Sequence, residues 1–128
     1  MKRMIFVRLV GREVHVELSR ESIVWAAGLF EGEGSISLSK LPSGKVYPRL
    51  KLKMCDKDVV EKFASIFKLQ VRDVQKDKTW KTHWKDAYYC DVCGSKAVAI
   101  LFMLYQFFGS RRKARAEEVI HLWKQNEC

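Results

Sequence analysis

Residues 25–34 read Trp25-Ala26-Ala27-Gly28-Leu29-Phe30-Glu31-Gly32-Glu33-Gly34, and this stretch decides the fold that we predict for the chain. It lies in a segment that starts with Ser19, a good N-cap residue, and has Glu21 where the first helical turn would be. We therefore expect a helix from about Arg20 to Glu31. After Gly34 the apolar residues recur at every second position, which is the period of a strand. The stretch marks the change from a helix to a sheet.

Two glycines in the predicted helix are unusual. Gly28 and Gly32 lie four residues apart on one helix face, and each disfavours a helix by roughly 1 kcal/mol relative to alanine. With Ala27 beside them, they form a face of small residues that admits a second backbone at very short range. The pattern predicts a helix that pairs with its own copy.

Two acidic residues stand near the C-terminal end of this helix. Glu31 and Glu33 lie where the helix dipole presents partial negative charge, which disfavours a carboxylate by roughly 0.3–1 kcal/mol. We expect a positive group to compensate. Carboxylates and terminal carbonyls are the hard oxygen ligands that Mg²⁺ prefers, so one interpretation is a divalent metal site. The other is a solvated helix end with glycine caps.

The segment after the helix predicts an antiparallel hairpin. Ile36 and Leu38 alternate with serines, residues 42–44 would turn the chain, and apolar and cationic residues alternate from Arg49 to Met54.

Further helices and strands follow this hairpin. The pattern predicts a helix at 56–67, strands near 69–78 and 84–92, and helices near 95–107 and 110–126. Residues 4–18 also alternate, and a turn at Gly11-Arg12 would make them a short hairpin. Consecutive hairpins favour an α+β fold with helices on one face of an antiparallel sheet. We expect one domain over residues 1–128, with 1–19 as an N-terminal extension.

The charge of the chain indicates a polyanionic partner. Lys and Arg number 24 against 15 Asp and Glu, a formal net charge of +9. Nucleic acid is the commonest such partner, whereas a membrane-surface protein would concentrate its basic residues in one amphipathic segment. Arg8 interrupts the first apolar run before it resembles an export signal, and no stretch is long enough to span a membrane. We expect a soluble intracellular protein, in a compartment that the sequence leaves open.

The four cysteines are Cys55, Cys90, Cys93 and Cys128. An intracellular location argues against disulfides. Cys90 and Cys93 form a CxxC pair that, with His83, raises the question of a zinc site, but a structural zinc site needs four ligands. Packing within a strand over residues 87–92 is the preferred interpretation.

Residues 26–34 resemble the LAGLIDADG motif of homing endonucleases, in the form found in many intron-encoded members, and Ser35-Ile36-Ser37 is a common continuation. The resemblance extends to Leu50–Met54, Asp56–Phe63, Val92–Ala97 and Arg111–Glu117, and covers about residues 20–124. The fold that it implies is an αββαββα saddle of four antiparallel strands backed by helices. The element order predicted above agrees with it.

The resemblance implies a metal-dependent endonuclease that cuts both strands of DNA at a specific site. In this family the motif helices of two subunits pack at the dimer axis, which here would involve Ala27, Gly28 and Gly32. Glu33 corresponds to the acidic residue that binds Mg²⁺, for which Ca²⁺ or Mn²⁺ can substitute in crystals, and the Gly32 carbonyl would be a second metal contact. The chain has one motif, so the resemblance implies a homodimer and a near-palindromic target.

A two-stranded ribbon fits the major groove, where base edges present distinguishable donors and acceptors. Candidates for DNA contact are the side chains opposite the apolar face of the first hairpin and the basic residues of the second: Ser37, Ser39, Tyr47, Arg49, Lys51, Lys53, Arg72, Lys76, Lys78, Lys81 and Lys85. For any one of these lysines, a solvated surface charge explains the residue equally well.

Two further positions bear on catalysis. Arg112 stands where the family often has Lys or Arg, so the resemblance implies that it stabilises the charged phosphate. An ordinary phosphate contact at a helix N-terminus is the alternative. Many relatives place a polar residue, often glutamine, at the end of the second strand, where this chain has Met54. That departure would weaken the positioning of the attacking water.

Three alternatives to a nuclease stay open. A protein of this fold that binds DNA without cutting would be a regulator, although Glu33 argues against lost activity. A maturase would hold intron RNA on the basic surface, commonly by aromatic stacking, for which Tyr47, Trp80, Trp84 and Tyr89 are available. The third alternative is an unrelated basic α+β scaffold.

Overall fold

The computed structural model describes residues 2–9, 12–74 and 86–126. Its elements are β1 (Lys2–Leu9), β2 (Arg12–Ser19), α1 (Arg20–Glu33), β3 (Gly34–Lys40), β4 (Val46–Met54), α2 (Lys57–Phe67), β5 (Arg72–Asp73), β6 (Tyr88–Cys93), α3 (Ser95–Leu104), η1 (Tyr105–Phe107) and α4 (Ser110–Asn126). The predicted α+β class is confirmed. No helix in the described ranges has the length and apolar character needed to cross a membrane.

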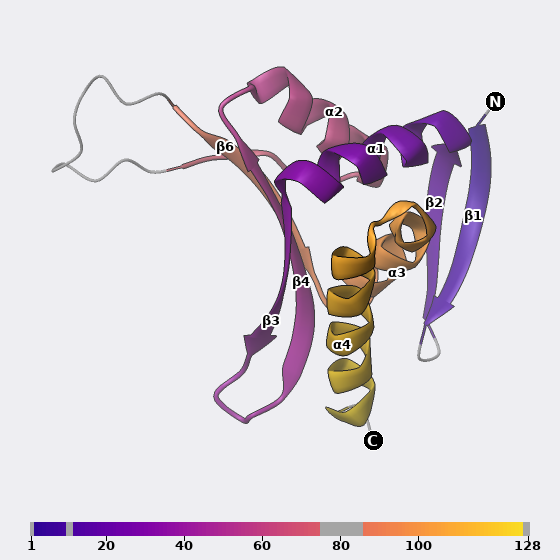
Figure 1. Ribbon diagram of the computed structural model, residues 1–128, viewed down its shortest axis with the longest axis vertical. Helices are drawn as coiled ribbons and strands as arrows, with labels where there is room; N and C mark the ends of the chain where they lie inside the picture. The colour runs from indigo at the N-terminus through magenta and orange to yellow at the C-terminus, as the bar shows by residue number, and fades with distance from the viewer. Residues whose placement is uncertain (1, 10–11, 75–85, 127–128) are drawn as a thin grey trace, which may run out of the picture.

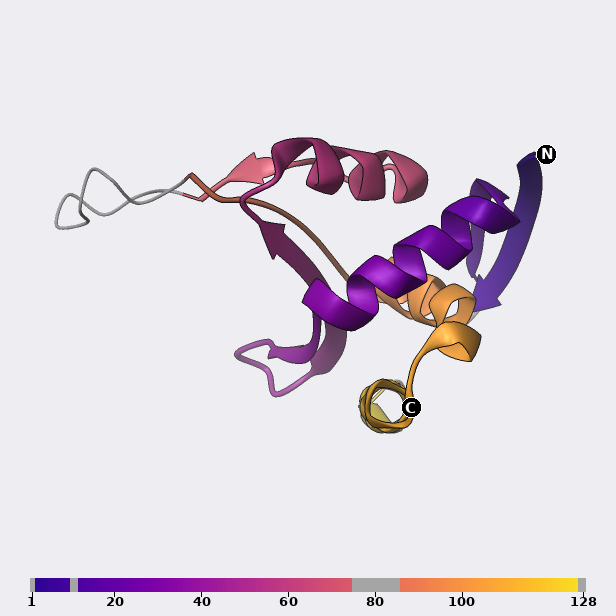
Figure 2. The same cartoon turned by 45° about the horizontal axis from the view of Figure 1, so that its top comes forward.

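A four-stranded antiparallel sheet forms the centre of the fold, with strand order β3-β4-β6-β5. Strands β3 and β4 are the predicted first hairpin, in which Ile36 pairs with Leu50. β4 pairs in turn with β6, so that Leu52 lies opposite Cys90. The sheet is curved, and the helices cover its convex side (Figure 1). Figure 2 shows α1 crossing this side between α2 and α4.

The strands β1 and β2 form a second antiparallel sheet, which is the hairpin that the alternation over residues 4–18 predicts. It contacts α1 and α3 and lies on the other side of these helices from the four-stranded sheet (Figure 1). Ser19 ends β2 and caps α1, because its side-chain oxygen accepts a hydrogen bond from the Ser22 N–H at 3.1 Å. The hairpin therefore leads directly into α1.

The core lies between the four-stranded sheet and the helices, and Phe30 of α1 is fully buried in it. The Phe30 ring stacks on Phe63 of α2 and on Phe108, with ring centroids 6.1 and 6.0 Å away. Gly34 passes so close to this ring that a Cβ at position 34 would lie 2.3 Å from it. Because Phe30 directly precedes Glu31, the packing of this ring fixes where the acidic end of α1 lies.

Helix α1 runs further than predicted. It continues to Glu33 rather than Glu31, because the Gly34 N–H bonds to the Phe30 carbonyl and extends the helix by two residues. Both acidic residues thus belong to the helix itself, and the strand begins at the next residue.

The predicted strand at 69–78 is shorter within the described residues. β5 covers only Arg72–Asp73, and residues 75–78 lie outside the described ranges. α2 ends on Lys68, which has a left-handed backbone (φ 55°), and the Leu69 N–H bonds back to the Ala64 carbonyl. This C-terminal cap occupies the residues at which the strand was expected to begin.

The CxxC pair does not form a metal site. Cys90 and Cys93 lie on opposite faces of β6, because side chains alternate along a strand. Cys90 is buried opposite Leu52, while Cys93 is exposed opposite Arg49. Burial, and to a lesser extent the charge of Asp91, raises the pKa of the Cys90 thiol from 9.0 to about 11. His83 lies outside the described residues.

Candidate functional site

The two acidic residues at the end of α1 have different surroundings. Glu31 turns toward the start of α4, where its Oε2 lies 3.9 Å from Arg112 Nε. Its Oε1 would be 3.0 Å from a Cβ at Gly109, so the carboxylate rests against the backbone that leads into α4. A helix N-terminus carries partial positive charge. The positive compensation expected at this helix end is therefore present for Glu31, from Arg112 and from α4.

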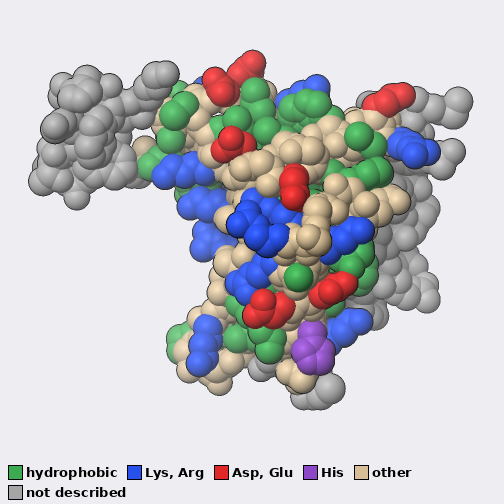
Figure 3. All heavy atoms as spheres, in the orientation of Figure 1, with side chains coloured by type: hydrophobic (Ala, Val, Ile, Leu, Met, Phe, Trp, Pro, Cys, Tyr) green, Lys and Arg blue, Asp and Glu red, His purple; other side chains and the backbone are tan. Residues whose placement is uncertain are grey.

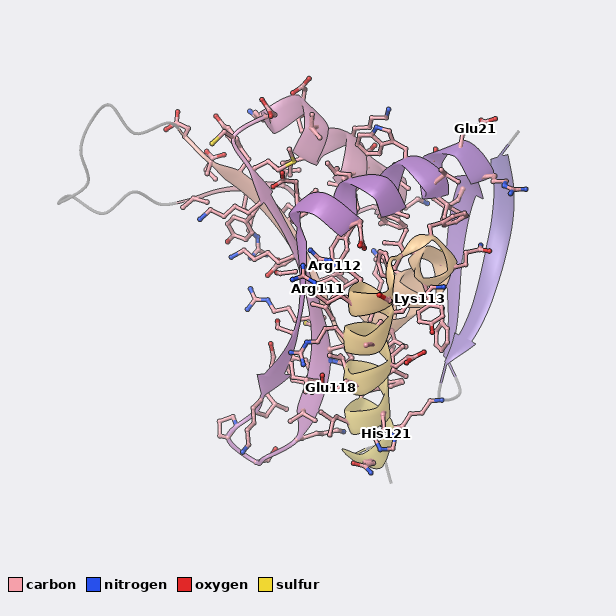
Figure 4. All side chains as sticks on the ribbon, viewed as in Figure 1. Glu21, Arg111, Arg112, Lys113, Glu118 and His121 are labelled. Atoms are coloured by element: carbon pink, nitrogen blue, oxygen red, sulfur yellow. The ribbon has the colours of Figure 1, made fainter. Side chains whose placement is uncertain are left out.

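Arg112 is held in place by this arrangement. Its side chain is only 14% exposed, and its guanidinium lies 5.6 Å from the centre of the Phe30 ring. Arg112 Nε and Glu31 Oε2 are both buried without a hydrogen-bond partner among the described residues. The neighbouring Arg111 is exposed. Figure 4 shows the two arginines at the start of α4, beside the end of α1.

Glu33 is exposed at the point where α1 passes into β3. Within the described part of the chain, it has no cationic partner at ion-pair distance. The repulsion between its charge and the helix dipole is therefore not relieved by these residues. Gly32, which precedes it, is also exposed, and the last carbonyls of a helix have no partner within the helix.

The oxygen donors at this helix end fit a divalent cation only in part. They are one carboxylate, that of Glu33, and the carbonyl groups of the last turn, whereas Mg²⁺ takes six oxygen ligands. No three His, Cys, Asp or Glu side chains come together as a metal site in the described ranges. A cation held here would need further ligands from outside the chain.

The sheet face away from the helices, called the open face below, carries polar and cationic side chains as the alternation predicts. Ser37 pairs with Arg49, whereas their neighbours Ile36 and Leu50 are buried against the helices. Lys51 lies on the open face of β4, and so does the exposed Lys53. Figure 3 shows lysines and arginines along the edge of the molecule that the sheet forms in Figure 1.

Strand β6 adds two residues to the open face: Tyr89, which the sequence offered only for RNA stacking, and Asp91, which sequence reasoning did not select. Asp91 pairs with Lys51 in the strand register, and Tyr89 pairs with Lys53 and with Arg72 of β5. The Lys51 ammonium lies 4.6 Å from the centre of the Tyr89 ring. The sequence could have indicated both residues. Side chains alternate along a strand, so residues 89 and 91 of the predicted strand share one face.

Not every candidate for DNA contact lies on the open face. Tyr47 packs instead against the cluster of Val98, Ala99 and Trp123 on the helix side, so its expected role is corrected. Tyr47 lies near the hairpin end of β4. Its ring is large enough to reach the apolar surface of that cluster and be covered by it. Lys76, Lys78, Lys81 and Lys85 lie outside the described residues.

Met54, at the end of β4, is partly buried and packs against the main core. Its strand neighbour Lys53 faces the opposite way, onto the open face. That Met54 weakens the positioning of the attacking water stays a prediction.

Helix α1 has an exposed stripe at helical spacing, formed by Val24, Gly28 and Gly32, with Val24 43% exposed. A Cβ at Gly28 or Gly32 would meet nothing within 4 Å, so packing within the described chain does not require glycine at either position. Ala27 is corrected: it is 0% exposed and belongs to the core, on the inner side of the helix.

Searches for related proteins give matches among solved structures only. No family model and no curated protein matches the chain. The crystal structure of the homing endonuclease I-CvuI in complex with its target is 17% identical, with a TM-score of 0.63 over 84% of this chain and 68% of that one. The group I intron-encoded homing endonuclease I-CeuI, complexed with DNA, is 21% identical, with a TM-score of 0.58 over 88% and 57%.

A third similar structure is the LAGLIDADG meganuclease I-AabMI bound to uncleaved DNA, which is 19% identical with a TM-score of 0.59. The chain adopts the LAGLIDADG homing-endonuclease fold. Its αββαββα core, with α1 as the motif helix, is the saddle that the resemblance implied. The chain spans 57% of the length of I-CeuI and 38% of I-AabMI. The I-CvuI structure is a complex with its target, and the I-CeuI and I-AabMI structures are complexes with DNA.

Proposed function

We propose that the protein is a site-specific endonuclease that hydrolyses both strands of a near-palindromic DNA target as a symmetric homodimer with divalent metal ions. The observation that carries the proposal is Glu33, an exposed carboxylate at the negative end of α1 with no cation beside it in the described chain. Glu31, two residues earlier, carries the same charge at the same helix end, but there Arg112 lies beside the carboxylate and compensates it.

A second copy of the chain would complete the site. The Val24, Gly28 and Gly32 stripe is exposed, and its glycines allow two α1 helices to approach closely. With the helices side by side, the two Glu33 carboxylates would be brought near each other at the twofold axis. Two carboxylates, helix-end carbonyls and DNA phosphates together offer the oxygen ligands that one chain lacks.

The roles of the chain's own residues follow from where they lie. Glu33 and the Gly32 carbonyl would hold Mg²⁺, which when bound activates water and stabilises the charge on the phosphate. Arg111 presents an exposed guanidinium to the phosphate, while Arg112 behind it adds positive charge and anchors Glu31. The open face of the sheet would lie in the major groove, with Ser37, Ser39, Arg49, Lys51, Lys53 and Arg72 facing the DNA.

Cleavage of a selected target tests the catalytic role of Glu33. The target is first obtained by selecting duplexes from a randomised pool in Ca²⁺, and cleavage is then started with Mg²⁺. We expect the parent chain to cut both strands, and Glu33→Gln to bind the same duplex with cleavage reduced by about a hundredfold or more. Glu21→Gln is the matched control, because Glu21 is an exposed glutamate at the other end of α1.

Other outcomes identify other functions. Site-specific binding by the parent without cutting in Mg²⁺ would identify a DNA-binding regulator. Binding of intron RNA that outcompetes the selected duplex would identify a maturase. Cleavage that survives in Glu33→Gln would remove Glu33 from the site.

Sedimentation of the chain with and without its duplex tests the assembly. We expect a dimer, and we expect Gly28→Leu to convert it to a monomer, because a side chain at position 28 has room in one chain but not between two close helices. Ser65→Leu on the exposed face of α2 adds the same side chain elsewhere and should leave the dimer intact. A parent that is monomeric even on DNA would contradict the homodimer.

A further inference from the structure

The open face carries one ion pair that the proposed cleavage chemistry does not use. Arg49 of β4 and Asp91 of β6 lie on adjacent strands, and Arg49 Nη2 donates a hydrogen bond to Asp91 Oδ2 at 2.5 Å. Arg49 is directly opposite Cys93, and Asp91 is opposite Lys51, so the pair runs diagonally across the strands. The Arg49 side chain is 42% exposed and that of Asp91 is 20% exposed. The guanidinium is thus held from one side and open to solvent on the other.

The charge of this pair argues against a simple phosphate contact. A phosphate would have to compete with the Asp91 carboxylate for Arg49, and the pair as a whole carries no net charge. Phosphate affinity comes from cations that replace the counterions of DNA. Lys53, four residues further along the same face of β4, is exposed and has no carboxylate within ion-pair distance among the described residues. Lys53 is therefore the better phosphate ligand of the two.

The geometry of the guanidinium favours recognition of a base. Arg has five N–H donors in a rigid plane, and the bond to Asp91 uses one of them. In the major groove guanine presents the N7 and O6 acceptors side by side, which match two parallel donors of an arginine. An arginine whose orientation is already fixed by a carboxylate loses less side-chain freedom on binding.

We propose that Asp91 holds Arg49 as the reader of one guanine in the major groove, so that the pair determines base identity and adds little to phosphate affinity. The inference rests on the DNA binding proposed above. It makes Arg49 the contact to the base and Asp91 the positioning residue behind it.

Selection from randomised duplexes in Ca²⁺ tests the proposal without requiring cleavage. The parent and four variants, Asp91→Asn, Arg49→Met, the double variant Arg49→Met/Asp91→Asn and Lys53→Met, are each selected, and the dissociation constant of each is measured between 50 and 200 mM salt. Thermal unfolding establishes that each variant is folded. Asp91→Asn preserves the size of the side chain, and Lys53→Met is the matched control for loss of a cation from the open face.

We expect the parent to require guanine at one position of each half-site. Asp91→Asn and Arg49→Met should both lower the preference for guanine at that position by about 5- to 100-fold, with the other positions unchanged. The double variant Arg49→Met/Asp91→Asn, which removes both charges of the pair, should leave the salt dependence as in the parent. Lys53→Met should keep the base preference and make the slope of log K against log salt shallower by about 0.9 for each copy bound.

Several results would overturn the proposal. One is a parental base preference that survives in Asp91→Asn or in Arg49→Met. Another is that the base preference lost in Arg49→Met is a preference for a base other than guanine. A third is a salt slope in the double variant Arg49→Met/Asp91→Asn that falls as it does in Lys53→Met, which would make Arg49 a phosphate ligand. A parent that selects no duplex sequence would overturn the proposed function as well, so the two failures are distinguishable.

Discussion

The glycines at the end of α1 serve different purposes, and the difference lies in what surrounds each one. Gly34 is required by the chain's own packing, because a Cβ there would lie 2.3 Å from the Phe30 ring. At Gly28, no atom of the described part of the chain lies within 4 Å of a Cβ built in the same way. A glycine that disfavours its helix without easing any contact among the described residues is what the proposed pairing of two α1 helices would require.

Alanine at these two positions should have opposite effects on the single chain. We expect Gly34→Ala to lower the free energy of unfolding by about 1–3 kcal/mol, because Phe30 must shift within a packed core. Gly28→Ala should raise it by up to about 1 kcal/mol when measured at a concentration where the chain is monomeric. Urea unfolding measures both. A destabilised Gly28→Ala monomer would show that Gly28 is needed within the chain.

Thiol reactivity follows from the different burial of the cysteines. At pH 8 we expect an alkylating reagent to modify the exposed Cys55 and Cys93 and to leave Cys90 unmodified until the chain unfolds. Mass spectrometry of the resulting peptides identifies the sites. Rapid modification of Cys90 in the folded protein would contradict the structure of β6.

The same thiol predicts a pH dependence of stability. Folding raises the pKa of Cys90 from 9.0 to about 11, so the unfolded chain releases its proton first as the pH rises. Its contribution is fully present below pH 9 and is lost as the pH rises toward 11. We expect Cys90→Ala to remove this part of the alkaline loss of stability, measured by urea unfolding across that range.

At the scale of elements, the contact between Glu31 and Arg112 joins the end of α1 to the start of α4. Figure 4 shows Arg112 below the last turn of α1, and the pair is separated by 3.9 Å. Phe30, on which Arg112 lies, belongs to the main core. Because Arg112 contacts both Phe30 in the core and Glu31, it helps to fix the position of the last turn of α1, which carries Glu33.

Removal of Arg112 should loosen this junction. We expect Arg112→Met to lower the free energy of unfolding by about 1–2 kcal/mol, because it leaves the half-buried Glu31 carboxylate unpaired. Arg111→Met should change it by less than about 0.5 kcal/mol, since Arg111 is exposed. A double-mutant cycle with Glu31→Gln measures the coupling. Equal losses in the two arginine variants would contradict the junction.

At the scale of the whole molecule, charge and shape act together. The chain has a net charge of +9, and its curved sheet presents cationic side chains on the face opposite the helices. The concave side offers an extended surface, as expected for a partner with a long, regular array of phosphates.

Binding to duplex DNA should consequently depend strongly on salt. If each dimer contacts at least about six phosphates, the association constant should fall by about a thousandfold between 50 and 200 mM salt. Titrations of a labelled duplex at several salt concentrations measure the slope. A nearly flat dependence would show that the charge of the open face does not contact the DNA backbone.

Local patterns in the sequence were sufficient for the order of the helices and strands and, apart from Tyr47, for which residues of the first hairpin face outward. These properties depend on caps, turns and periodicity over a few residues. The β3–β4 register, in which Ile36 pairs with Leu50, agrees with them. The motif also indicated the acidic helix end as the place to look for a site. Each of these signals is contained in a short segment.

Only the tertiary structure decided how these segments meet. That Glu31 has a cation beside it, and that Glu33 has none among residues 2–9, 12–74 and 86–126, depends on where Arg112 lies, which is far away in the sequence. Arg49 and Asp91 are 42 residues apart, and neither segment alone indicates their contact. Ala27 faces inward because the rotation of α1 about its axis is set by the packing of Phe30. Helical spacing places residues on a common face, but only packing against other elements selects the face that is buried.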